Sequence, residues 1–162
     1  MSRALIASFL ALNVVLIAVR RDLSIREDGI SSYLVGDLRW LGVLSFILLS
    51  AGGALLAVAV RSSWEPLRAG LSVLLLVYSS GVLLAGLTHP DSVAHQVGAF
   101  AAFAAIPVAT LVSSTRLRIL WFVVIAASFV AWPILHFGAG ERLTVLLELA
   151  WLLWLGLKRA MP

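Results

Sequence analysis

The chain has 162 residues, of which 62% are hydrophobic and 12% are charged, and its mean hydropathy is +1.06. Soluble domains contain roughly 45–50% apolar and about 25% charged residues, so this composition excludes a cytosolic enzyme and a disordered chain. We therefore predict an all-α integral membrane bundle in which residues 1–162 form a single transmembrane domain. The chain contains no cysteine, which also excludes disulfides and thiolate-bound metals.

Six apolar stretches have about the length that a membrane-crossing helix needs, which is about 20 residues. We treat the first as a retained helix, because no small-residue cleavage site for a signal peptide precedes Arg20. Five spans, with the first or last stretch lying elsewhere, are the alternative. The six predicted helices cover residues 4–19, 40–60, 69–87, 92–112, 119–137 and 140–157.

Local signals refine these helices. Asp91 or Ser92 is a natural N-cap for the fourth. Pro133 should kink the fifth, because proline lacks the backbone N–H that a helix interior requires. Trp40 and Tyr33 stand near predicted ends and are typical of aromatic anchors at a membrane interface.

Basic residues predict the orientation of the bundle. The formal charge is +4, which in a soluble protein would suggest nucleic acid. Here Lys and Arg stand between apolar runs, and the side that includes both termini carries more of them than the opposite side. The positive-inside rule therefore predicts cytoplasmic termini, with the lipid bilayer and no nucleic acid as partner. The basic residues of the predicted cytoplasmic side are Arg3, Arg61, Arg68, Arg116, Arg118, Lys158 and Arg159.

Polar residues concentrate toward the outer side. Glu148 is the only ionisable residue well inside an apolar run, about 12 Å deep at helical rise. We expect it to face the bundle, either uncharged and bonded to Asn13 or Ser80, or in contact with water. If the polar faces of the fourth and sixth helices meet, His95, Asp91 and Glu148 line one cavity. The predicted outer polar pocket comprises Asn13, Ser80, His89, Asp91, His95, His136, Glu141 and Glu148.

Three of these residues are weak candidates for a metal site. His89, Asp91 and His95 are metal-ligating types close together in sequence. Histidines near a membrane surface are more often solvated or helix-capping, however, and the chain contains no His-Glu-x-x-His pattern. We therefore predict no metal and no other cofactor.

Three sequence blocks resemble a known family. The chain is similar to the six-helix prokaryotic membrane family named domain of unknown function 998, in the order and spacing of the blocks over nearly its full length. The resemblance implies six membrane helices in a prokaryotic plasma membrane, and it implies no activity. The blocks are Ile30–Gly36 ahead of a helix containing Gly52, His89-Pro90-Asp91 followed by His95, and Gly138–Leu143 ahead of a helix containing Trp151.

Three functions remain open from the sequence. The favoured one is a binding or accessory protein for a lipid, another hydrophobic ligand or a larger membrane complex, with a polar pocket on the outer side. A membrane-embedded metal-dependent lipid hydrolase or transferase is the second. A proton-coupled transporter that uses Glu148 is the third. The chain carries no strong catalytic motif, so we favour a protein that is not an enzyme.

Overall fold

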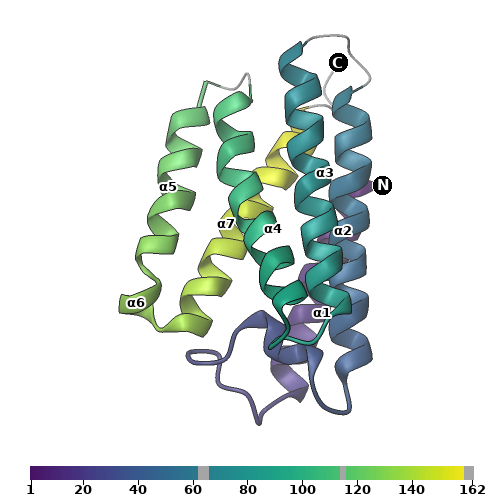
Figure 1. Cartoon of the computed structure of the whole chain (residues 1–162), viewed down its shortest axis with the longest axis vertical. Helices are drawn as coiled ribbons and strands as arrows, with labels where there is room; N and C mark the ends of the chain where they lie inside the picture. Colours follow the sequence, from purple (N-terminus) through teal and green to yellow (C-terminus); the bar gives the residue numbers. More distant parts are fainter. Residues whose placement is uncertain (62–65, 114–115, 159–162) are drawn as a thin grey trace.

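We analysed a computed structural model of the chain, which describes residues 1–61, 66–113 and 116–158 (Figure 1). All regular elements of this part are helices. Of the basic residues that predict the orientation, Arg159 lies outside the described residues. Arg61, Arg116 and Lys158 lie at the ends of the described ranges. The elements are α1 (Ser2–Val19), the 3₁₀ helix η1 (Ile30–Leu34), α2 (Arg39–Arg61), α3 (Pro66–Leu87), α4 (Val93–Val112), α5 (Arg118–Val130), α6 (Trp132–Leu135) and α7 (Phe137–Lys158).

Four helices are long and apolar enough to cross a membrane, namely α1, α2, α3 and α4. They match the first four predicted stretches to within a few residues. The predicted N-cap of α4 is confirmed, because the Ser92 hydroxyl accepts the backbone N–H of His95 at 3.1 Å. The first half of the chain therefore follows from its apolar runs and caps.

The fifth predicted helix is wrong in extent. Residues 119–137 do not form one helix, because α5 ends at Val130 and the short α6 begins at Trp132. Pro133 lies in the first turn of α6, where its missing N–H costs nothing. His136 then takes a positive φ of 67° and ends α6. The chain therefore turns a corner where the sequence suggested only a kink.

The sixth predicted helix is present as α7, but its composition differs from that of α1–α4. It has 22 residues and carries Glu141, Arg142 and Glu148 among apolar neighbours. The two carboxyl side chains are buried, as are Thr144 and Trp151. These four buried residues are spaced by three, four and three, so they form the inward stripe that helical periodicity predicts.

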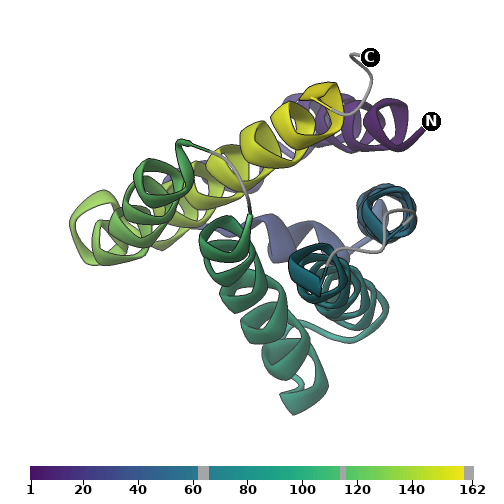
Figure 2. The ribbon, with the colours of Figure 1, turned by 90° about the horizontal axis from the view of Figure 1, so that it is seen from above.

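The helices form two groups that diverge on one side. In Figure 2, α7 lies beside α5 at one end and beside α1 at the other, while α2, α3 and α4 form the second group. The start of α1 and the end of α7 lie close together. A Cβ added to Gly156 in α7 would lie only 3.2 Å from Cγ of Arg3 in α1. The segment between α1 and α2, the α3–α4 turn and α6 all gather at the opposite end (Figure 1). We call this the loop-rich end.

Small residues allow a close contact between α3 and α4. A Cβ on Gly81 of α3 would lie 2.6 Å from the carbonyl oxygen of Gly98 in α4, and the reverse distance is 2.7 Å. Both neighbours are backbone, which cannot move aside as a flexible side chain would. The two glycines therefore allow α3 and α4 to pack backbone against backbone, as small residues do between membrane helices.

We expect Gly81→Ala to lower the free energy of unfolding by about 1–3 kcal/mol, because the added methyl group forces α3 and α4 apart. Gly70→Ala in the same helix is the matched control, since no atom lies within 4 Å of a Cβ at Gly70. Thermal unfolding of the purified protein in one detergent compares the two variants. Equal stability of both variants would contradict the role assigned to the Gly81–Gly98 contact.

Candidate functional site

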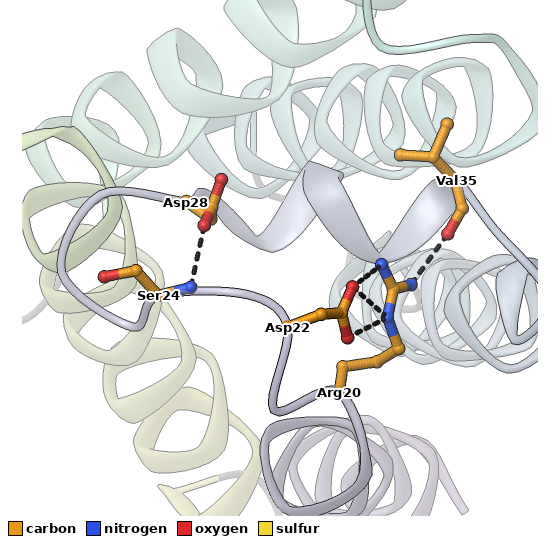
Figure 3. A network of polar contacts seen from close by, with 5 residues as sticks. All are labelled: Arg20, Asp22, Ser24, Asp28 and Val35. Carbon is orange, nitrogen blue, oxygen red and sulfur yellow. Dashed lines mark hydrogen bonds and ion pairs between the residues drawn. The ribbon is translucent and has the colours of Figure 1, made fainter.

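The segment between α1 and α2 is folded by its own polar contacts (Figure 3). The Arg20 guanidinium donates to the Asp22 carboxylate at 2.9 and 2.8 Å, and to the carbonyl of Val35 at 2.7 Å. The hydrogen bond from Arg20 holds the pKa of Asp22 below its usual range. A second loop closes where Ser24 N–H donates to the Asp28 carboxylate at 2.7 Å. These contacts give residues 20–38 a defined shape without a regular helix over most of their length.

Arg142 of α7 holds this segment to the bundle. Its guanidinium donates to the carbonyl oxygens of Ile25 (2.9 Å), Asp28 and Gly138 (3.2 Å). Its other terminal nitrogen donates to the Tyr33 hydroxyl at 2.9 Å, and the guanidinium carbon lies 5.6 Å from the centre of the Tyr33 ring. Arg142 therefore satisfies two backbone carbonyls of the irregular segment 20–38 and one carbonyl of its own helix, α7.

Glu141 binds the same segment from the neighbouring position. Its carboxylate accepts the backbone N–H of Ile30 at 2.9 Å, at the start of η1. This contact and the bond from Arg142 bury Tyr33 in the bundle, so the expectation that Tyr33 is an interface anchor is wrong. Trp40 does remain exposed. The Ile30–Gly36 and Gly138–Leu143 blocks, more than a hundred residues apart, are thus in direct contact.

A small internal cavity lies beneath this contact. It has a volume of about 50 Å³, which is enough for water. Most of its wall is apolar and comes from α1, α2, α3, α4, α7 and η1. The polar and ionisable side chains on the wall are Ser31, Tyr78, His95, Glu141 and Glu148.

The His95 ring bonds to the backbone of α3. The ring is 7% exposed, and Nδ1 lies 2.8 Å from the carbonyl oxygen of Ala85. A carbonyl oxygen only accepts hydrogen bonds, so Nδ1 carries a proton. The α3 backbone therefore selects the tautomer of the neutral form of the ring, in which the lone pair is on Nε2.

Glu148 faces the bundle, as predicted. The residue is 2% exposed and lies on the cavity wall. Its Oε1 atom is buried without a hydrogen-bond partner among the described residues. The predicted bonds are absent, because the Asn13 amide donates to Phe9 at 2.9 Å and Ser80 is exposed. Of the two alternatives, contact of Glu148 with the contents of the cavity is the one that this geometry supports.

A larger groove lies next to the cavity, on the side of the bundle. Its volume is about 730 Å³, within the range of sites for small molecules. It runs between α4 on one side and α5, α6 and the start of α7 on the other. The cavity and the groove share five wall residues, so the two spaces adjoin. These residues are Ser31, His95, Ala99, Phe103 and Glu141.

The structure brings only part of the predicted pocket together. His95, Glu141 and Glu148 meet at the cavity, and Asp91 lines the groove. The other four predicted residues lie elsewhere, two on other helix faces and two in the connections between helices. Asn13 is buried and donates to Phe9 within α1, Ser80 is exposed on another face of α3, His89 is exposed beside Asp91 in the α3–α4 turn, and His136, which follows α6, contacts Arg26 and Glu27.

The weak metal candidates are not gathered. His89 Nδ1 lies 3.6 Å from the Asp91 carboxylate on the surface, whereas the His95 ring is buried and turned toward Ala85. No group of three or more potential ligands occurs among the described residues.

Sequence reasoning missed the residues that shape the groove. Trp132 lies on the groove wall, and its indole N–H donates to the Thr144 hydroxyl at 2.9 Å. That hydroxyl lies 2.8 Å from Ser128 Oγ, which links α5 to α7. Thr144 lies in the inward stripe of α7, but nothing local indicates its partners. Arg142 was missed as a contact residue, although Gly138 and Gly140 just ahead of it are typical of a close approach by other segments.

Four apolar helices of spanning length, which line the small cavity together with η1 and α7, indicate a polytopic membrane protein. Within that class, the chain belongs to the family described as Protein of unknown function (DUF998), which matches residues 5–158. The match confirms the resemblance noted from the three blocks. No curated protein and no solved structure matched the chain.

Proposed function

We propose that this protein binds a membrane amphiphile, whose apolar part lies in the groove and whose polar head reaches the cavity. The observation that carries the proposal is that the two spaces adjoin. An apolar groove of about 730 Å³ lies against a cavity where Glu148 Oε1 is buried without a hydrogen-bond partner among the described residues. A single amphiphilic molecule fills the apolar groove and gives Glu148 Oε1 a hydrogen-bond partner. Such a partner matters because burying an unpaired polar atom is costly.

The proposed orientation places the site at the outer face of a prokaryotic plasma membrane. In this proposal α5 with α6, and α7, complete six passes, and both termini are cytoplasmic. The closeness of Arg3 and Gly156 at the end opposite the site supports it, as does the distribution of basic residues. We expect reporter fusions within residues 29–36 to read external and fusions after residue 158 to read cytoplasmic. An external carboxyl terminus would contradict six passes.

We expect Ala104→Phe to weaken amphiphile binding by about tenfold, equivalent to about 1.4 kcal/mol. Ala104 lines the groove and is exposed, so the larger side chain fills the groove without disturbing the core. Val97→Phe is the control, because Val97 is exposed on α4 and lines a different surface.

Lipid retained after mild purification, and displacement of a fluorescent amphiphile from the protein in nanodiscs, measure the effect. Binding that Ala104→Phe leaves unchanged would contradict a ligand in this groove. Loss of binding in both variants would indicate a general effect of the added ring and would also contradict the assignment.

A further inference from the structure

Acidic residues, and no Arg or Lys, line the groove and the cavity in the described part of the chain. The described residues that line either space include Asp91, Glu141 and Glu148 but neither Arg nor Lys. Arg142 is adjacent in sequence, but its guanidinium is directed to the carbonyls of the 20–38 segment and to Tyr33. An anionic head group would therefore meet carboxyl groups without a compensating cation.

We infer that the amphiphile carries a primary ammonium head. This inference rests on the proposed binding function and names the ligand class. The head lies in the cavity between Glu148 and His95, and the apolar chain follows the groove toward the membrane.

The cavity presents acceptors where the head group arrives. Glu148 is only 2% exposed, and its Oε1 atom lacks a hydrogen-bond partner within the described part of the chain. In the neutral form of the His95 ring, Nε2 is a second acceptor, since the Ala85 carbonyl holds a proton on Nδ1. A primary ammonium supplies three N–H donors in a small volume, whereas an alcohol supplies one and a sulfate supplies none. It also fits a volume of about 50 Å³ better than a bulky quaternary head.

The groove offers an aromatic entry for a cation. Trp132 is central, with ring centres 5.6 Å from Phe103 and 5.4 Å from Phe137, both close to perpendicular to it. All three rings line the groove. Ring faces attract an ammonium group when the cation lies within about 6 Å of the ring centre. The same rings give an apolar surface for the chain that follows the head.

The absence of Lys and Arg from both linings also distinguishes two sources of the ammonium group. Phosphatidylethanolamine carries a primary ammonium but brings a phosphate, for which the described lining offers no basic partner. A simple long-chain amine brings no such anion. We therefore expect the amine to bind more tightly than the phospholipid, although both present the same group to Glu148.

Equilibrium binding of radiolabelled dodecylamine tests the inference, using the full chain in phosphatidylcholine nanodiscs with empty nanodiscs as background. Dodecanol, dodecyl sulfate and phosphatidylethanolamine serve as competitors. We expect dodecylamine to bind at least about tenfold more tightly than dodecanol or dodecyl sulfate. Glu148→Gln should remove most of this preference, and Asp37→Asn should leave it unchanged because Asp37 lines neither space.

Glu141→Gln provides a second variant if Glu148→Gln folds poorly, because the amide oxygen still accepts the Ile30 N–H. It should also reduce the preference for the amine. Equal binding of dodecanol, or tighter binding of dodecyl sulfate, would overturn the ammonium inference while leaving an amphiphile site in place. Failure of every amphiphile to bind would overturn the proposed function itself. Competition by phosphatidylethanolamine as strong as that by dodecylamine would identify a membrane lipid as the source of the same head group.

Discussion

Arg142→Met is expected to release the segment of residues 20–38 from the bundle. The substitution keeps an apolar stem but removes the hydrogen bonds to Ile25, Asp28, Gly138 and Tyr33. Hydrogen bonds to a charged group contribute about 1.5–3 kcal/mol each. Water replaces part of what is lost, so we expect the free energy of local opening to fall by about 2–4 kcal/mol. Hydrogen exchange of amides 20–38 in nanodiscs measures this change.

Two further variants define the cause. Arg142→Lys keeps the charge but loses the planar fork, so it should protect the segment only partly. Arg21→Met removes an exposed arginine from the same segment and should leave exchange unchanged. If amides 20–38 exchange as slowly in Arg142→Met as in the wild-type protein, other contacts hold the segment. Because Ser31 of η1 lines the cavity, release should also weaken amphiphile binding.

Thr144→Val is expected to lower the free energy of unfolding by about 1–3 kcal/mol, the cost of leaving a buried donor unsatisfied. Thr144 is fully buried, and its hydroxyl accepts the Trp132 indole N–H and contacts Ser128 Oγ. Valine has nearly the same shape, so the packing stays and only the hydrogen bonds are removed. Thermal unfolding in detergent measures the loss, and a shift in the emission of Trp132 reports on the groove wall.

Thr110→Val is the matched control. Thr110 is equally buried, but among the described residues its hydroxyl bonds only to the Pro107 carbonyl in its own helix, at 2.6 Å. Within the described part of the chain the hydroxyl links no other element, so its replacement should cost much less. Equal losses in the two variants would indicate that the Thr144 network contributes no more than an ordinary intrahelical hydroxyl.

The three blocks that carry the family resemblance converge on one place. Glu141 binds the start of η1 at Ile30, and Arg142 binds Tyr33 within the same block. His95, from the block that follows α3, lies on the cavity wall with Glu141. Each block alone is a short loop or helix start with a weak motif. Their contact explains why polar residues occur at the loop-rich end of an otherwise apolar bundle.

Features that depend on neighbouring residues in the chain were predictable. The apolar runs of α1–α4 determine helix length, since the backbone in a bilayer must satisfy its own hydrogen bonds. Ser92 caps α4 because its hydroxyl reaches an N–H three residues ahead. The inward stripe containing Glu148 follows from helical periodicity and from the cost of a carboxyl group in lipid.

Other features depended on which helices become neighbours. The sequence indicated a polar outer side, but Ser80 and Asn13 are polar residues whose faces meet other surroundings. Pro133 predicted a disruption of the helix, but the corner at His136 also depends on the close approach of Gly140 to Trp132. A Cβ placed on Gly140 would lie 2.6 Å from Cδ1 of Trp132. Such contacts have no local periodicity, so no pattern in the chain announces them.

The sequence by itself determined that this is an all-α membrane protein, where its first four helices lie, and that Glu148 faces inward. Those properties follow from hydrophobicity, capping and helical spacing, which act over a few residues. Only the tertiary structure decided that Arg142 and Glu141 hold a distant segment, and that His95 and Glu141 meet at a cavity next to a groove. The reason is that a side chain's partners depend on how helices pack, and packing is a property of the whole chain.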